Sequence, residues 1–420
     1  MITGKRIEAS RAAPAGLVLA AGAAAGFLTG RDGSPGWQVT RVALVLLLTA
    51  AAAYGVLRRR PWLRAAVAVA VGLPAVVGGA GIALPHLGKS GLTLAATAGC
   101  IALAAGAALL GYGAVGLVTS TRCRWRVGTA GALLAVTAVG LFCGIQAVAS
   151  TNVPRTGIGA ATPADRGLPY EEATFRTPDG VDLSGWYIPG AGRGTVILLH
   201  GAGSTRTDVL DHAAVLAAGG YGVLLFDARG HGASGGRAMD FGWYGDEDVA
   251  GAVACLRGRQ DVDRDRIAAV GLSMGGEEAV GAAAASPGLR AVVAEGVTSR
   301  ASADWAFLAD AYGFRGRIQQ HVNGLTTALT DLLTAAEPPI ALRAAAAAAA
   351  PRPILLIAAG DRPDEVHAAR HLQRAGAHVQ VWQVPDTGHT RALHTHPGEW
   401  RQRVTAFLDA AFAEHAGHGR

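Results

Sequence analysis

The sequence predicts two parts: an all-α membrane region of about five helices, followed by an α/β domain with a doubly wound, mostly parallel sheet. Residues 1–150 hold 13 Lys and Arg against 2 Asp and Glu, whereas residues 151–420 hold 24 Arg, no Lys and 29 Asp and Glu. The chain is 50% hydrophobic and 16% charged, against about 25% charged in soluble domains. This composition excludes a disordered chain and a wholly soluble protein. Because the second part is mildly acidic, we expect no nucleic-acid partner.

Five apolar stretches in the first part are long enough to cross a bilayer, which takes about 20 residues. They cover about 12–30, 37–57, 65–85, 92–119 and 127–149. Small residues such as Gly99, Gly106 and Gly113 in the fourth stretch would let helix backbones approach closely. The stretches hold almost no ionisable side chains, which favours an anchor or a small scaffold bundle over a transporter or sensor.

Loop charge predicts the orientation of these spans, because Lys and Arg concentrate on the cytoplasmic side. The segments on one side carry ten cations and those on the other carry three. The ten are Lys5, Arg6, Arg11, Arg58, Arg59, Arg60, Arg64, Arg122, Arg124 and Arg126; the three are Arg31, Arg41 and Lys89. We therefore expect an integral plasma-membrane protein, in contact with the lipid bilayer, whose N-terminus is cytoplasmic and whose chain after residue 150 lies outside.

Strands and helices alternate in the second part, after a Pro- and Gly-containing linker at 151–167. Residues 173–188 read as a hairpin around a Pro-Asp-Gly turn. The later apolar runs lack alternation, as do strands buried on both faces of a parallel sheet. These runs are 194–200, 221–230, 265–273, 289–296, 352–360 and 378–385, with helical stretches at 244–258, 275–286, 363–375 and 398–415. The pattern is typical of βαβ units.

Residues 301–350 interrupt this alternation and are predicted to form a helical, cap-like insert. In doubly wound sheets ligands bind outside the carboxyl ends of the strands. We expect the insert to lie there and to line the substrate pocket with its aromatic residues. These are Trp305, Phe307, Tyr312 and Phe314, and they favour an apolar acyl or aryl group.

A nucleophile is predicted at Ser273, in the sequence Gly-Leu-Ser-Met-Gly-Gly at 271–276. This sequence follows a predicted strand and opens a predicted helix, which is the context of the G-x-S-x-G nucleophile elbow. Serine needs an adjacent base, and His389 occupies the loop directly after the last predicted strand. His394 and His396 lie nearby and are interpreted as solvated loop residues. Ser273 and His389 therefore form the predicted catalytic pair.

Two backbone N–H groups are expected to form an oxyanion hole. One is that of Met274, which follows the predicted nucleophile, and the other is that of Ala202, in the His-Gly-Ala-Gly-Ser loop at 200–204. The triad carboxylate should follow the strand at 352–360, where three acids lie within five residues. Asp361 is preferred because it stands at the strand end. Asp364 and Glu365 remain alternatives, although acids are also common in the first turn of a helix without a catalytic role, because they complement the helix dipole.

These motifs resemble the α/β-hydrolase superfamily, and most closely its dienelactone-hydrolase-like and serine-aminopeptidase-like branch. The matching segments are ILLHGAGS at 197–204, LLFDARGHGASGG at 224–236, DRIAAVGLSMGG at 265–276 and PDTGHT at 385–390. The resemblance covers about residues 168–415 and implies an α/β-hydrolase fold with a serine hydrolase site. It implies nothing about residues 1–150. The loop after 352–360 departs from the family's usual acid-bearing loop in being shorter.

The leading interpretation is a membrane-anchored serine hydrolase that cleaves an ester, thioester or amide through an acyl-enzyme. A peptidase of the same fold and a non-catalytic membrane-bound binding module are the alternatives. The substrate would be a small-molecule ester or amide, or a peptide. We expect no cofactor and no metal, because the acids Asp246, Glu247 and Asp248 fit a helix start and no histidine pattern accompanies them.

Overall fold

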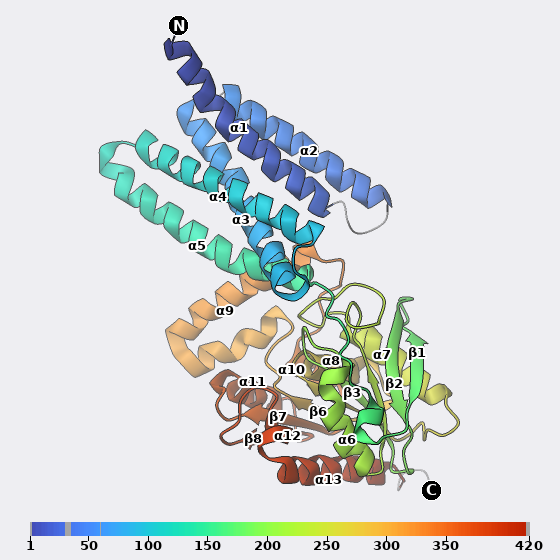
Figure 1. The fold of residues 1–420 in the computed structure, drawn as a ribbon. Helices are drawn as coiled ribbons and strands as arrows, with labels where there is room; N and C mark the ends of the chain where they lie inside the picture. Colours follow the sequence, from blue (N-terminus) through green and yellow to red (C-terminus); the bar gives the residue numbers. More distant parts are fainter. Residues whose placement is uncertain (1, 30–34, 59, 417–420) are drawn as a thin grey trace. The chain divides into compact units, whose positions relative to one another are not determined.

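The structure is a computed structural model that describes residues 2–29, 35–58 and 60–416. It divides into two compact units, Met1–Pro154 and Arg155–Arg420 (Figure 1). Residue 30, at the end of the first predicted span, and the loop cations Arg31 and Arg59 lie outside the described residues.

The first unit is helical. Its helices are α1 (Ile2–Thr29), α2 (Pro35–Arg58), α3 (Pro61–Ser90), α4 (Leu94–Ser120) and α5 (Arg126–Thr151), with the 3-10 turn η1 (Cys123–Trp125) before α5. Within the described residues, four helical segments are long and apolar enough to cross a membrane: Gln38–Leu57, Pro61–Ser90, Leu94–Ser120 and Cys123–Thr151. The unit therefore has the character of a membrane protein.

The first of the five predicted spans differs from the other four. It lies in α1, whose apolar part among the described residues is the shorter segment Ala13–Leu28. Four of the five predicted spans thus coincide with helices of spanning length. The first predicted span ends at residue 30, outside the described residues, and its crossing of a membrane stays a prediction.

Glycines on α3 and α4 let these two helices approach closely. A Cβ on Gly79 would lie 2.4 Å from the backbone N of Leu103, and one on Gly106 would lie 2.7 Å from the backbone N of Val76. Real Cβ atoms do not come this close to backbone, so only glycine fits. Small residues therefore set the packing of these apolar helices.

The second unit contains an eight-stranded sheet in the order β1-β2-β4-β3-β5-β6-β7-β8. Strand β2 pairs antiparallel with β1 and β4, and the other neighbours pair parallel. The strands are β1 (Glu171–Arg176), β2 (Asp182–Ile188), β3 (Thr195–Leu199), β4 (Gly222–Phe226), β5 (Ile267–Leu272), β6 (Leu289–Glu295), β7 (Ile354–Ala359) and β8 (Val379–Val384). The predicted doubly wound, mostly parallel sheet is confirmed.

Helices cover both faces of this sheet (Figure 1). Along β3, Ile197 and Leu199 belong to one apolar core and Val196 and Leu198 to the other. The first core is closed by α7 (Gly245–Gly258), α8 (Met274–Ala285), α10 (Leu342–Ala348) and α11 (Pro363–Gln373), the second by α6 (Leu210–Ala218), α12 (Ala392–Thr395) and α13 (Pro397–Ala416). Burial on both faces explains why the strand sequences are continuously apolar.

The segment predicted as an insert, 301–350, contains the 3-10 turn η4 (Ser302–Ala306), the long helix α9 (Phe307–Leu333) and α10. Only part of it is peripheral. Leu342 and Ala345 of α10 are fully buried in the core beside α8. Helix α9 has non-helical backbone angles at Gly313, which divide it into a short first part and a longer second part.

Candidate active site

Ser273 stands on a strained turn between β5 and α8. Its φ of 55° and ψ of −121° lie in a region that residues with a Cβ rarely adopt. The turn is possible because its neighbours are glycines. A Cβ on Gly271 would lie 2.1 Å from the carbonyl oxygen of Gly275, and one on Gly275 would lie 2.6 Å from that of His200. The backbone of this turn is thus packed directly against the loop after β3.

His389 lies in the loop after β8 and reaches Ser273. Its Nε2 is 2.9 Å from Ser273 Oγ, so the hydroxyl can donate to the imidazole. Gly296, at the end of β6, makes room for the ring: a Cβ there would lie 2.8 Å from His389 Cε1, and its φ is +76°. The structure therefore brings together the two residues that the sequence analysis paired.

The carboxylate that contacts His389 is Glu365, and not the preferred Asp361. Glu365 Oε1 accepts a hydrogen bond from His389 Nδ1 at 2.6 Å, and the glutamate is buried. Asp361 is exposed at the surface, and Asp364 accepts a hydrogen bond from the Tyr312 hydroxyl at 2.6 Å. In this geometry Glu365, one of the two alternatives, contacts His389, and the preferred Asp361 does not.

The short loop after β7 explains this outcome. Pro363 starts α11 only four residues after the strand ends, so the acids at 364 and 365 already lie in the first helical turn. The side chain of Glu365 turns back toward the sheet, where its Oε2 accepts the backbone N–H of Ala359 at 3.0 Å. This bond orients the carboxylate toward His389. The hydrogen bond that His389 donates to Glu365 raises the pKa of His389 above its usual value, against the opposing effect of burial.

The predicted oxyanion donors lie on either side of Ser273. Met274 is the first residue of α8, where backbone N–H groups have no partner within the helix. Ala202 lies in the loop after β3, and a Cβ on the neighbouring Gly201 would lie 3.3 Å from Ser273 Cβ. The two residues therefore belong to the start of α8 and to the loop after β3, which meet at Ser273.

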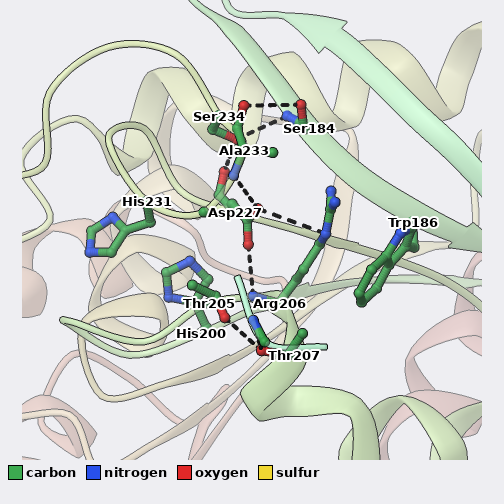
Figure 2. Close-up of polar contacts among 12 residues, drawn as sticks. Ser184, Trp186, His200, Thr205, Arg206, Thr207, Asp227, His231, Ala233 and Ser234 are labelled. Carbon is green, nitrogen blue, oxygen red and sulfur yellow. Dashed lines mark hydrogen bonds and ion pairs between the residues drawn. The ribbon is translucent and has the colours of Figure 1, made fainter. Parts of the chain in front are cut away.

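Asp227 connects the loop after β3 to the loop after β4 (Figure 2). Its Oδ1 accepts the backbone N–H of Arg206 and its Oδ2 that of Ala233, each at 2.9 Å. The Arg206 guanidinium lies 3.7 Å from Asp227 Oδ2 and stacks over the Trp186 ring. Both charged side chains are buried. This buried ion pair fixes the position of the loop that carries Ala202.

The other histidines near the site have structural contacts. His200 Nε2 accepts the backbone N–H of Ala228 at 3.0 Å, so His200 joins the same two loops. His394 lies 3.6 Å from Asp211, and His396 Nε2 is 3.0 Å from the carbonyl oxygen of Pro385. None of these contacts involves Ser273, Glu365 or His389.

Glu295 is a residue of the site that the sequence analysis missed. Its backbone oxygen accepts the N–H of Ser273 at 2.7 Å. Its carboxylate accepts the N–H of Ala392 at 2.9 Å and that of the Trp400 indole at 3.3 Å, which ties down the helix after the His389 loop. Burial raises the pKa of Glu295 to about 7. The sequence did contain a signal for Glu295, because this acid ends an otherwise apolar strand.

A cavity of about 230 Å³ opens beside Ser273. It is lined by Gly201, Ala202, Ser204, Asp208, Val209, His212, Leu272, Ser273, His389, Thr390 and His394. No residue of 301–350 is among them, so Trp305, Phe307, Tyr312 and Phe314, which were expected at the substrate pocket, do not line this cavity. The insert aromatics lie elsewhere: Phe307 packs with Leu308 and Ala368.

Asp246 and Asp248, at the start of α7, are engaged in ion pairs. Asp246 binds the guanidinium of Arg300 at 2.7 Å, and Asp248 that of Arg229 at 2.6 Å. Among the described residues there is no group of three or more His, Cys, Asp or Glu side chains placed to hold a metal ion. The side chains at this helix start therefore stabilise the fold through charge pairing.

Residues 196–403 match the model of the alpha/beta hydrolase family. Together with the strand order, this match identifies the second unit as an α/β-hydrolase domain, and the predicted resemblance is confirmed.

Individual relatives cover only part of the chain. An uncharacterized protein of Mycobacterium tuberculosis is 33% identical over 174 residues, which is 40% of this chain and 61% of that protein. A thiohydrolase of Aspergillus aculeatus is 34% identical over 128 residues, 30% of this chain and 40% of the thiohydrolase. A solved esterase of Pyrococcus furiosus is 27% identical with a TM-score of 0.49, covering 61% of this chain and 96% of that structure. The chain thus spans less than two thirds of the length of the mycobacterial protein and of the thiohydrolase.

Proposed function

We propose that the protein is a membrane-anchored serine hydrolase in which Ser273, His389 and Glu365 form the catalytic triad. The observation that carries this proposal is the unbroken hydrogen-bonded series from Ser273 Oγ through both nitrogens of His389 to Glu365, with distances of 2.9 and 2.6 Å. Each contact has the geometry that proton transfer requires. A binding module would have no need for such a series, which argues against that alternative.

In this mechanism His389 Nε2 takes the Ser273 proton while Oγ attacks the carbonyl carbon of the substrate. Glu365 holds the imidazole in the tautomer with the proton on Nδ1 and stabilises the imidazolium that forms. The N–H groups of Ala202 and Met274 bind the oxyanion. His389 then protonates the leaving alcohol, thiol or amine, and water releases the acyl group from Ser273 by the same steps in reverse order.

The cavity favours a small acyl group. Its volume of about 230 Å³ is below the 300–1,000 Å³ typical of sites for drug-sized ligands. Its lining combines small apolar residues with polar groups such as Asp208 and His394. A short-chain ester or thioester fits this space, and the thiohydrolase activity named for one relative is compatible with it. A peptidase that removes a small residue is the second candidate.

The membrane orientation proposed from the sequence does not depend on whether α1 spans the bilayer. The loop between α4 and α5 carries Arg122, Arg124 and Arg126, which favour the cytoplasm. Because α5 crosses once after that loop, the hydrolase domain lies outside. A C-terminal alkaline phosphatase fusion should then be active, and a C-terminal green fluorescent protein fusion in its place should be dark. A fluorescent green fluorescent protein fusion together with an inactive phosphatase fusion would show the opposite orientation, with the hydrolase domain in the cytoplasm.

Hydrolysis itself is tested with the purified full chain in detergent. p-Nitrophenyl esters of increasing acyl length are compared with aminoacyl p-nitroanilides. We expect turnover of short esters that falls as the chain lengthens and disappears in Ser273→Ala. Faster turnover of anilides than of esters would favour the peptidase, and equal turnover by wild type and Ser273→Ala would reject the triad.

A further inference from the structure

The second part of α9 presents its apolar side chains to the outside. Phe314, Ile318, Leu325 and Leu332 are spaced four, seven and seven residues apart, which places them on one stripe of a helix. Their exposed fractions are 74%, 51%, 42% and 81%. All four are large hydrophobic residues. The helix therefore exposes the kind of surface that the rest of the domain buries.

The opposite side of α9 is polar or small, and it is this side that packs inward. Gly316, Thr326 and Thr330 are buried, and Gly324 faces Ser302, whose Oγ would lie 3.2 Å from a Cβ at this position. An amphipathic helix on a soluble domain shows the reverse arrangement, with its apolar side toward the core. The polarity of α9 is thus inverted, and its outer stripe fits an apolar surrounding.

The charges beside the stripe are mostly basic. Residues 311–332, which include the whole stripe, contain Arg315, Arg317 and His321 and one acid, Asp331, although the domain as a whole carries more acids than bases. Both arginines are exposed. A helix with an apolar stripe flanked by Arg binds in the interface of a bilayer that contains anionic lipids.

A short connection joins the domain that carries α9 to the membrane helix α5. Helix α5 ends at Thr151, and Arg155 already donates hydrogen bonds to carbonyl oxygens of the hydrolase domain, such as that of Gly232 at 3.1 Å. Three residues separate these two positions, so their Cα atoms are at most about 14 Å apart when the chain is extended. A domain tethered so closely to a membrane helix meets lipid more readily than it meets a free protein partner.

We propose that the stripe formed by Phe314, Ile318, Leu325 and Leu332 docks into the surface of the membrane that anchors the protein. This inference rests on the proposed membrane anchoring. The stripe lies in the acyl-chain boundary, and Arg315 and Arg317 contact anionic headgroups. The contact gives the hydrolase domain a second attachment to the bilayer besides α5 and fixes its orientation there.

The test uses the full chain with its four native cysteines replaced by Ser. One cysteine at a time is introduced in place of Phe314, Ile318, Gln319 or Leu134 and labelled with nitrobenzoxadiazole. The proteins are reconstituted in vesicles of phosphatidylcholine and phosphatidylglycerol, with or without brominated acyl chains. Gln319 is exposed outside the stripe of the same helix, and Leu134 is an exposed residue of α5 that reports membrane insertion.

We expect bromolipids to reduce the emission at Phe314 and Ile318 by roughly half or more, because both positions enter the acyl-chain boundary. Emission at Gln319 should change little. Omitting phosphatidylglycerol, or combining Arg315→Gln with Arg317→Gln, should weaken quenching at Phe314 and leave Leu134 unchanged. Circular dichroism of each variant checks that it folds.

Two other results would overturn the inference. Quenching at Leu134 without quenching at Phe314 and Ile318 would reject lipid docking while the anchor stands. Lipid docking would also be rejected if the labels at Phe314 and Ile318 reported an apolar surrounding without being quenched by bromolipids. In that case a second copy or another part of the chain would cover the stripe. No quenching at Leu134 would reject the membrane anchor itself, and the docking proposal with it.

Discussion

The turn at Ser273 and the contact between α3 and α4 both depend on glycines that let two backbones touch, but the close contact serves a different purpose in each. In the turn, a Cβ on Gly275 would lie 2.6 Å from the carbonyl oxygen of His200; between the helices, one on Gly79 would lie 2.4 Å from the backbone N of Leu103. In both places glycine lets two backbones touch. The turn uses this closeness to lift one polar side chain into a cavity, and the helices use it to pack without polar groups.

The surroundings of the two contacts differ accordingly. The buried residues of α3 and α4 are almost all Ala and Gly, and large apolar side chains such as Leu134 of α5 point outward. Around Ser273, by contrast, buried carboxylates hold the loops, and burial raises the pKa of Glu277 and Glu295 to about 7 each. Among the described helices of the hydrolase domain, α9 alone also exposes several large apolar side chains. This shared outward-facing apolar surface is the reason for proposing that α9, like the helices of the first unit, contacts lipid.

The largest effect on catalysis is expected in the active site, at Glu365. Glu365→Gln should lower kcat by about 10⁴-fold, because the imidazole loses the carboxylate that fixes its tautomer and stabilises its charge. Asp361→Asn should leave kcat near the wild-type value, since Asp361 is exposed and does not contact His389. Ester hydrolysis by the folded variants decides between them. A large loss in Asp361→Asn with normal activity in Glu365→Gln would restore the assignment made from the sequence.

A smaller effect is expected when the turn loses its glycine. Gly275→Ala forces the turn and the loop after β3 apart, because the added Cβ would meet the carbonyl oxygen of His200 at 2.6 Å. A displacement of about 1 Å in a site costs on the order of 10²-fold in rate. The matched control is Gly258→Ala, where the added Cβ meets no atom within 4 Å. Equal kcat/KM for the two variants would show that close packing at Gly275 does not place Ser273.

The corresponding change in the membrane helices should affect stability and not catalysis. Gly79→Ala overpacks the contact between α3 and α4, which costs about 1–3 kcal/mol. Gly111→Ala, on α4 with no atom within 4 Å, should be neutral or stabilising because Ala favours helix. Thermal unfolding in detergent, followed by helical circular dichroism, compares the two. A lower Tm for Gly111→Ala than for Gly79→Ala would contradict the proposed packing role.

The smallest effect is a shift in pH dependence. Catalysis needs neutral His389, so kcat/KM should rise with pH through the raised pKa of this residue, with a midpoint above the usual 6.5. The residual activity of Glu365→Gln should rise at lower pH, since the hydrogen bond that raises the pKa is removed. Asp361→Asn should keep the wild-type midpoint. Identical midpoints for wild type and Glu365→Gln would show that Glu365 does not control His389.

Much of the fold was predictable because its physical signals are local. Buried parallel strands have continuous apolar sequences, so the runs that became β3 to β8 were recognised, and the loops after β5 and β8 indicated Ser273 and His389. The partner of His389 depended on how one side chain turns in the first helical turn of α11, which spacing does not specify. The aromatic residues of 301–350 were expected at the pocket because the sequence shows that they are present. It does not show in which direction their side chains point.

The proposal that Ser273 is an acyl nucleophile is tested most directly by covalent labelling. The full chain is treated with a fluorophosphonate probe, and the labelled residue is located by peptide mass spectrometry, beside Ser273→Ala and His389→Ala. We expect one phosphonylated residue, Ser273, in the wild type, no label in Ser273→Ala and slow labelling in His389→Ala, because the base no longer activates the hydroxyl. Equal labelling of wild type and Ser273→Ala, or a label on another serine, would contradict the proposed mechanism.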